Sequence, residues 1–131
     1  MLVVDASAMH YALAGNSFTA RRLRRRIRTE RTAVPEVHDL EVLATVRGLL
    51  IARKSTAAEA EEVLADHGRL DLLRYSHAPL RTRIWELRHN LTAYDAAYVA
   101  LAEALDATLI TGDAGIGSAP GTRCEIDLIS D

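Results

Sequence analysis

The sequence predicts an α/β fold: a three-layer α/β/α sandwich in which helices cover both faces of a mostly parallel sheet. Short apolar runs of strand length recur along the chain, and amphipathic segments of helix length separate them. Strands that are apolar throughout are typical of parallel sheets buried on both faces. The chain has 131 residues, of which 49% are apolar, which is enough for one hydrophobic core and too little for two. We therefore expect a single domain over residues 1–131.

The first two helices are bounded by recognisable signals. The apolar run at residues 1–5 predicts a strand, and Gly15 is placed to end the helix that follows it. Ser17 is placed to cap a second helix that extends to about residue 31, with an apolar stripe on one side. This part of the sequence thus predicts a strand followed by two consecutive helices.

The middle of the chain predicts a short strand at 33–34 and then two helices, 36–53 and 56–67. Pro35 is expected to open the first of them, since proline is favoured in the first turn of a helix. Residues 36–53 are apolar on nearly every side, so we expect that helix to be deeply packed. Further strands are expected at 70–75, 108–111 and 125–130, and further helices at 79–89 and 93–106.

Charge and cysteine content narrow the function classes. The net charge is −2, yet residues 21–31 contain seven arginines and one glutamate, so an acidic protein can still offer a basic strip to a polyanion. Cys124 is the only cysteine, which excludes an internal disulfide and a cysteine zinc site. The apolar N-terminus lacks a basic lead-in, and no apolar run reaches membrane-span length. We expect a cytoplasmic protein without membrane contact.

Four acidic residues are the candidate functional site. Asp5 and Asp113 follow the first and fourth expected strands, at the carboxyl edge where parallel sheets gather function. Glu41 and Asp95 lie on otherwise apolar helix faces, where a buried carboxylate is costly unless something compensates its charge. A divalent cation such as Mg²⁺ or Mn²⁺ would do so.

Each acid also has a purely structural interpretation. Asp5 can cap the helix after it, and Asp113 can form a turn. Asp95 follows Thr92 at capping-box spacing, and Glu41 can face solvent or pair with an arginine. These alternatives stay open for each residue alone, but one cation site explains all four residues together.

Four segments of the chain carry a resemblance to a known family: residues 3–8, 40–43, 91–102 and 109–113. They resemble, in order and spacing, the acidic segments of PIN-domain ribonucleases, and the block from Tyr94 to Ala102 is the most specific of them. The length is similar to that of a VapC-type toxin of a type II toxin–antitoxin system.

The resemblance implies a PIN-like fold and endoribonuclease activity that depends on Mg²⁺ or Mn²⁺. It assigns the acidic quartet as Asp5, Glu41, Asp95 and Asp113: Asp5 and Asp95 as direct ligands, Asp113 direct or through water, and Glu41 holding a second ion or orienting water. Ser7 and Thr111 fall where the family often places supporting hydroxyls. It also implies an RNA substrate, a homodimer and inhibition by a VapB-type antitoxin. The alternative is a non-catalytic PIN-fold module that binds RNA or protein.

Other residues carry weaker expectations. The arginines form a solvated face, contact RNA phosphates, or meet the antitoxin or dimer mate; the possible RNA contacts are Arg21, Arg22, Arg24, Arg25, Arg26 and Arg28. The histidines show no metal-ligand spacing. Trp85 is expected in packing or a subunit interface rather than as a base-stacking platform, and Tyr94 and Tyr98 in the core or at its rim. An antitoxin peptide is expected to dock on the early helices; the residues expected to offer surface there are Met9, Tyr11, Leu13 and Phe18.

Overall fold

The computed structural model describes residues 1–130; Asp131, the last residue of the expected domain, lies outside the described residues. Five strands form one sheet in the order β3-β2-β1-β4-β5, and every pairing among the described strands is parallel. The strands are β1 (Leu2–Val4), β2 (Thr32–Pro35), β3 (Leu73–Tyr75), β4 (Thr108–Thr111) and β5 (Ile126–Leu128). The expected parallel sheet is therefore confirmed.

Strand β1 lies at the centre of the sheet, between β2 and β4. Val3 pairs with Ala33 on one side and with Leu109 on the other. The strand order reverses beside β1, since β2 and β3 extend to one side and β4 and β5 to the other. The carboxyl ends of β1 and β4 thus flank the crevice where open α/β sheets place their ligands.

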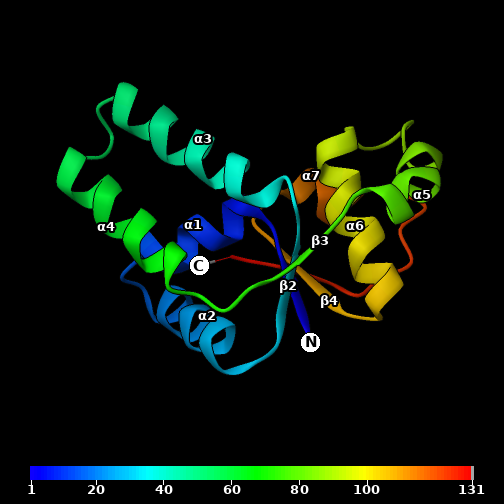
Figure 1. Ribbon diagram of the computed structural model, residues 1–131, viewed down its shortest axis with the longest axis horizontal. Helices are drawn as coiled ribbons and strands as arrows, with labels where there is room; N and C mark the ends of the chain where they lie inside the picture. The colour runs from blue at the N-terminus through cyan, green and yellow to red at the C-terminus, as the bar shows by residue number, and fades with distance from the viewer. Residues whose placement is uncertain (131) are drawn as a thin grey trace.

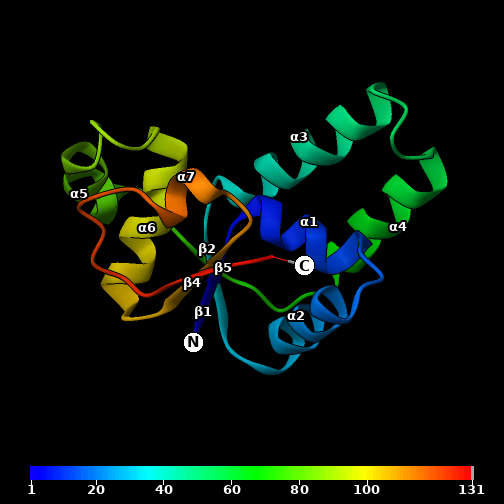
Figure 2. The ribbon, with the colours of Figure 1, turned by 180° about the vertical axis from the view of Figure 1, so that it is seen from behind.

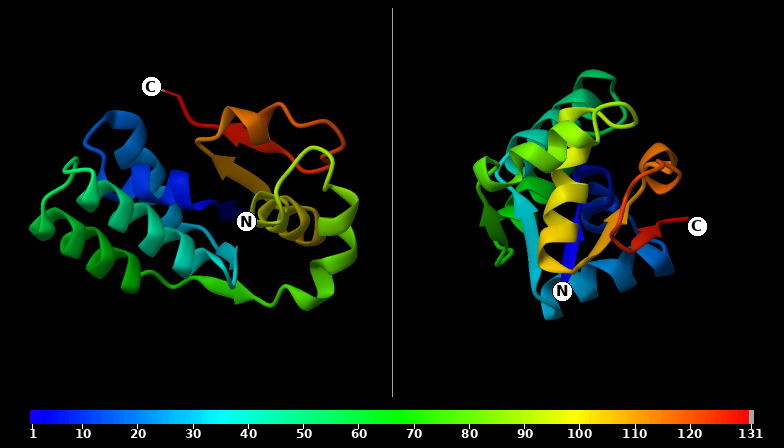
Figure 3. Two further views of the ribbon diagram at one scale, coloured as in Figure 1. Left: turned by 90° about the horizontal axis from the view of Figure 1, so that it is seen from above. Right: turned by 90° about the vertical axis from the view of Figure 1, so that its right-hand side faces the viewer.

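Helices cover both faces of the sheet (Figures 1 and 2). They are α1 (Ala6–Ala14), α2 (Phe18–Thr29), α3 (His38–Ile51), α4 (Ala57–Gly68), the 3₁₀ helix η1 (Ala78–Leu80), α5 (Arg81–Glu86), α6 (Ala93–Leu105) and α7 (Ala114–Gly117). Helices α1 to α4 lie on one side of the sheet and α5 to α7 on the other, which Figure 3 shows from two further directions. The three-layer α/β/α sandwich is confirmed.

The alternation of side chains along β1 explains the two cores. Leu2 and Val4 face helices α1 to α4, whereas Val3 faces α6 and α7. All three are buried, so β1 is apolar on both faces as expected. Burying such side chains contributes about 1.5–3 kcal/mol each.

The helix boundaries agree with the capping signals in the first third of the chain. Ser17 Oγ accepts a hydrogen bond from the backbone N–H of Ala20 at the start of α2. Gly15 follows α1, where a Cβ atom would lie 2.6 Å from the carbonyl oxygen of Tyr11. Only glycine allows this close approach, which explains why glycine occupies the C-cap of α1.

Three expectations on helices were wrong. Pro35 does not open a helix: it ends β2, paired with Tyr75, and α3 begins at His38. The expected helix 79–89 is shorter, because η1 and α5 end at Glu86. Helix α3 is not deeply packed, since Leu40 and Ile51 are 68% and 62% exposed.

The exposure of α3 follows from its position. Helix α3 packs mainly against α1 and α4, and with α4 it forms a hairpin that extends beyond the sheet (Figure 1). A helix that meets neighbours on one side leaves its other apolar residues in water. None of the helices in residues 1–130 is long and apolar enough to cross a membrane.

Candidate active site

All four predicted acids line one pocket at the carboxyl edge of the sheet. Asp5 follows β1, Asp113 follows β4, Glu41 lies in α3 and Asp95 lies in the first turn of α6. The pocket has a volume of about 280 Å³, and its other lining residues include Ser7 and Tyr98. Residues that are far apart in the sequence therefore meet in one acidic hollow.

Asp5 is buried and held by three hydrogen bonds. Its Oδ1 accepts from Ser7 Oγ at 2.8 Å and from the backbone N–H of Ala8 at 2.8 Å. Its Oδ2 accepts from Thr111 Oγ1 at 2.5 Å. Since each carboxylate oxygen has two lone pairs, Oδ2 keeps one free to accept a ligand or a cation. Asp5 thus has a fixed orientation with one lone pair to offer.

The two predicted supporting hydroxyls join β1 to the turn after β4. Ser7 Oγ accepts from the backbone N–H of Gly112 at 3.1 Å, and Thr111 Oγ1 accepts from that of Asp113 at 3.0 Å. Each hydroxyl therefore donates to Asp5 and accepts from the turn. The arrangement holds the backbone of Asp113 at a defined place relative to Asp5.

Two of the structural interpretations also hold. Asp5 caps α1 through Ala8, and Asp113 Oδ1 accepts from the backbone N–H of Gly115 at 2.7 Å. Helix α6, in contrast, is capped by Thr92, whose Oγ1 accepts from the backbone N–H of Asp95 at 3.2 Å. This cap bond uses the Asp95 backbone N–H, so a substitution of the Asp95 side chain leaves its donor in place.

The acids repel one another. Burial, and then the neighbouring carboxylates of Asp113 and Asp5, raise the pKa of Asp95 above its usual value, against the lowering effect of a hydrogen bond with Thr92. Burial likewise raises the pKa of Glu41, as do Asp95 and Asp5, while its bond with Tyr98 opposes the shift. A positive ion in the pocket would favour the charged carboxylates and so lower the pKa of both Asp95 and Glu41.

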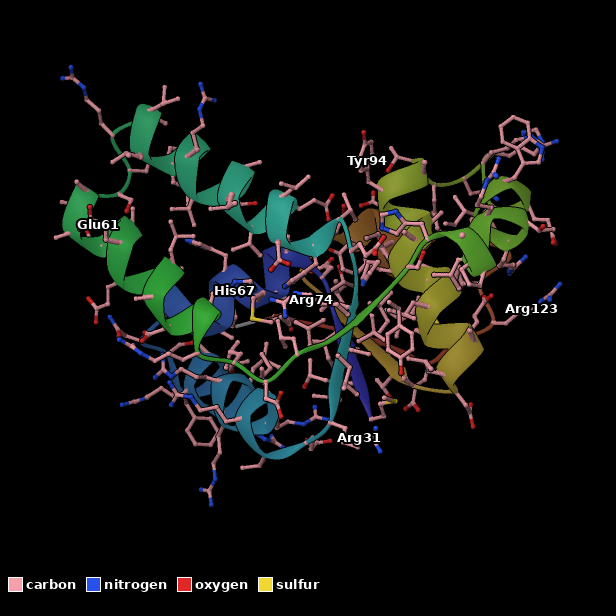
Figure 4. All side chains as sticks on the ribbon, in the orientation of Figure 1. Arg31, Glu61, His67, Arg74, Tyr94 and Arg123 are labelled. Atoms are coloured by element: carbon pink, nitrogen blue, oxygen red, sulfur yellow. The ribbon has the colours of Figure 1, made fainter. Side chains whose placement is uncertain are left out.

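A buried chain of hydrogen bonds, which the sequence did not reveal, extends away from Glu41. Tyr98 Oη donates to Glu41 Oε1 at 2.6 Å and lies 3.1 Å from His38 Nδ1. His38 Nε2 lies 3.1 Å from Nε2 of His67, which Figure 4 labels on α4. Part of this chain could have been found from the sequence, because His38 and Glu41 are three residues apart and so share one face of α3.

The donors in this chain have one consistent order. Burial, and then the charge of His67, lower the pKa of His38 to about 3, so His38 is neutral at pH 7. Tyr98 gives its single proton to Glu41, so its oxygen accepts from His38 Nδ1–H. The bare Nε2 of His38 then accepts from His67 Nε2–H. Every donor in the chain therefore points towards Glu41.

The donor set of the pocket suits a hard cation, but it is not a closed cage. Carboxylate oxygens are the ligands that Mg²⁺ and Mn²⁺ prefer. No group of three or more Asp, Glu, His or Cys side chains in residues 1–130 stands arranged to hold a metal ion. Mg²⁺ often binds through one or two carboxylates and retains several waters, which is the mode this open pocket fits.

The arginine cluster is divided between structural and free residues. Arg24 Nη1 donates to the carbonyls of Ala12 and Gly15, so this side chain fastens α2 to the end of α1. Arg26 pairs with Glu30 and Asp127. The exposed arginines of α2, for which the described residues show no such partner, are Arg21, Arg22, Arg25 and Arg28.

Two residues expected to form a docking surface belong to the core. Met9 and Leu13 are buried, which contradicts the expectation that they offer surface, whereas Phe18 is 75% exposed. Residues of α1, α2, α3 and α4 line a groove of about 710 Å³, and its lining includes His10, Arg28 and Glu62.

Comparison with known proteins gives consistent matches. The PIN domain family model matches residues 2–121. Ribonuclease VapC1 of Mycobacterium tuberculosis (strain ATCC 25618 / H37Rv) is 41% identical over 128 residues, or 97% of this chain and 96% of that protein. Ribonuclease VapC9 of the same strain is 42% identical over 129 residues, or 98% of each chain.

Two crystal structures are similar in fold. PAE2754 from Pyrobaculum aerophilum superimposes with a TM-score of 0.72 at 25% identity, over 97% of this chain and 83% of that one. VapBC2 from Rickettsia felis, bound to a DNA fragment from their promoter, has a TM-score of 0.66 at 17% identity over 98% of each chain. The second likeness concerns the fold alone.

Proposed function

The chain belongs to the PIN-domain family, and from that premise we propose that it is a divalent-metal-dependent endoribonuclease acting as the toxin of a VapC-type toxin–antitoxin pair. The observation that carries the proposal is the meeting of Asp5, Glu41, Asp95 and Asp113 in one pocket. The names of the VapC relatives support RNA as the substrate. The proposed place of action is the cytoplasm.

The proposed ligands divide according to their surroundings. Asp5 offers its remaining Oδ2 lone pair, and Asp95, in the first turn of α6, is the second direct ligand. The exposed Asp113 binds directly or through water. Glu41 holds a second ion or a water. A bound Mg²⁺ or Mn²⁺ would lower the pKa of a coordinated water and relieve charge on the phosphate.

The remaining groups position this set. Ser7 and Thr111 keep Asp5 from rotating, and Tyr98 keeps Glu41 directed into the pocket. Since Tyr98 occupies one lone pair of Oε1, Oε2 of Glu41 is the oxygen with more capacity for a water or ion.

The proposed partner is a VapB-type antitoxin. One segment of it would lie in the groove lined by α1, α2, α3 and α4, and the exposed ring of Phe18 at the start of α2 offers an apolar contact. An arginine of the antitoxin would fork onto two carboxylates of the pocket, since guanidinium and carboxylate pair in a bidentate manner. A neighbouring gene for a small DNA-binding protein that co-purifies in an inactive complex would support this partner.

The proposed homodimer would use the outer face of α3. Leu40, Leu43 and Ile51 are exposed apolar side chains on this helix. A second copy of the chain would bury them, and Leu43→Glu should then convert a dimer into a monomer. Light scattering that shows the same mass for both proteins would place the interface elsewhere.

The test of the ribonuclease is cleavage mapping on total cellular RNA with Mn²⁺, with Mg²⁺ and with excess chelator. We expect discrete cuts with either ion and none with the chelator. Full cleavage in the chelator would refute metal dependence. RNA binding without any cleavage would favour the non-catalytic module instead.

A further inference from the structure

We propose that Trp85 and the hollow beside it form a base-stacking subsite for a single-stranded segment of the RNA substrate. This inference rests on the proposed function and extends it to a second site on the far side of α6. The sequence favoured packing or a subunit interface for Trp85. Packing into the core is excluded, because Trp85 is 67% exposed.

The hollow has the chemistry of a nucleotide site. It has a volume of about 810 Å³, and its floor includes the apolar side chains of Ile84 and Leu91. Arg81 and Arg88 also line it, and none of its described lining residues is acidic. An apolar surface for a base and two cations for phosphates are the features with which proteins bind single strands.

Arg88 holds the indole in place before any ligand arrives. Its guanidinium carbon lies 4.6 Å from the ring centroid, and its Nη1 donates to the backbone carbonyl of Trp85 at 2.9 Å. The stacking aromatic is thus oriented in the free protein. Other N–H groups of the guanidinium can still reach a phosphate.

The hollow lies within a short stretch of RNA from the carboxylate pocket. Ala93 lines the hollow and Asp95 lines the pocket, so the two sites flank the first turn of one helix. In Figures 1 and 3, α6 stands between α3 and α5. A helix with its side chains is about 10–12 Å wide, which about three stacked nucleotides span at roughly 3.4 Å each.

Tyr94 lies in the sequence between Ala93, which lines the hollow, and Asp95, which lines the pocket. It follows Ala93 on the same helical turn and is 60% exposed. Figure 4 shows its side chain at the outer end of α6, directed away from the helix. The exposed rings of Trp85 and Tyr94 therefore offer two stacking surfaces to an RNA strand that extends from the hollow to the acids.

Charge favours RNA over a second copy of the chain. In a two-fold dimer the same patch meets itself, so Arg81 and Arg88 would face like charges. The outer face of α3 is apolar and lies on the other side of α6, so it is the better candidate for a subunit contact.

The test uses the fact that Trp85 is the only tryptophan in the chain. A single-stranded RNA of about six nucleotides, twice the length that joins the two sites, is added to the full-length protein in chelator, so that no cleavage occurs. We expect saturable quenching of the tryptophan fluorescence. Anisotropy of a labelled RNA should show about a tenfold loss of affinity in Trp85→Leu and recovery of most of it in Trp85→Phe, because only an aromatic ring stacks on a base.

Two controls separate the outcomes. Phe18→Leu removes another exposed ring, on α2, and should change the affinity less than twofold. RNA binding without quenching would overturn the subsite, as would a Trp85→Leu variant that becomes monomeric with unchanged RNA affinity. Cleavage of the same RNA in Mn²⁺ is a separate readout: quenching without cleavage rejects the ribonuclease alone, and cleavage without quenching rejects the subsite alone.

Discussion

Replacing His38 with glutamine should make the fold less sensitive to acid. His38 is fully buried, and burial lowers its pKa from 6.5 to about 3. The unfolded chain therefore binds a proton at this residue from about pH 6.5 downward, while the folded chain does not. Because the unfolded chain binds the proton and the folded chain does not, stability is lost as the pH falls below 6.5, and the loss is complete near the folded pKa.

At about pH 5 the loss of stability is set by the difference between the unfolded pKa and the pH. One pKa unit corresponds to about 1.4 kcal/mol, so the step from 6.5 to about 5 weakens the fold by roughly 2 kcal/mol. His67, whose pKa burial also lowers, adds to the loss. Glu41 and Asp95 oppose it, because their raised pKa values favour the protonated folded state.

The assay is the free energy of unfolding in urea at about pH 7.5 and about pH 5, for the natural protein and for His38→Gln. The difference in this loss between the two proteins reports on His38 and its hydrogen-bond partner His67, whatever the variant loses at neutral pH. We expect the variant to lose about 2 kcal/mol less on acidification, and the exposed control His89→Gln to behave as the natural protein. Parallel pH dependences for all three proteins would refute the buried neutral histidine.

Three further changes test the site and the arginine helix. Asp5→Asn should lower cleavage about a hundredfold or more. It should also lower stability by about 1–3 kcal/mol, because the asparagine NH₂ group cannot accept the hydrogen bond that one of the hydroxyls of Ser7 and Thr111 donates to the carboxylate. Normal cleavage would remove Asp5 from the site. Tyr98→Phe should weaken Mn²⁺ binding severalfold, since Glu41 loses the hydroxyl that donates to its Oε1; unchanged calorimetric affinity would make Tyr98 a core residue only. Arg21→Gln with Arg25→Gln should flatten the salt dependence of RNA binding by about 0.7–0.9 log units per lost contact; an unchanged slope would return these arginines to a solvated face.

The alternation of apolar runs and the acids at strand ends were enough to predict the sheet and the pocket. Strand ends in a parallel sheet share one edge, so Asp5 and Asp113 had to lie near each other once β1 and β4 were neighbours. Helical spacing likewise placed Asp95 at the start of α6. Both inferences depend on local periodicity, which the sequence carries directly.

The features that escaped prediction depend on tertiary neighbours. Residues 36–53 are apolar, but the burial of α3 depends on which elements pack against it. Helix α3 packs mainly against α1 and α4, so part of its apolar surface stays exposed. The pairing of His38 with His67 needs the α3–α4 hairpin, which brings residues 29 positions apart within 3.1 Å. The hollow beside Trp85 requires α5 to end at Glu86, which the sequence alone does not predict.

The most direct test of the shared cation site is a calorimetric titration of Mn²⁺ into the natural protein and into Asp95→Asn at about pH 7.5. Asparagine has the same shape, and the cap of α6 is kept because it uses the Asp95 backbone N–H. We predict saturable binding to the natural protein and at least about tenfold weaker binding to the variant. The variant should unfold at an equal or higher urea concentration, since the substitution relieves repulsion among the acids. Equal Mn²⁺ affinity in the two proteins, or no binding to either, would contradict the assignment of these four carboxylates as one metal site.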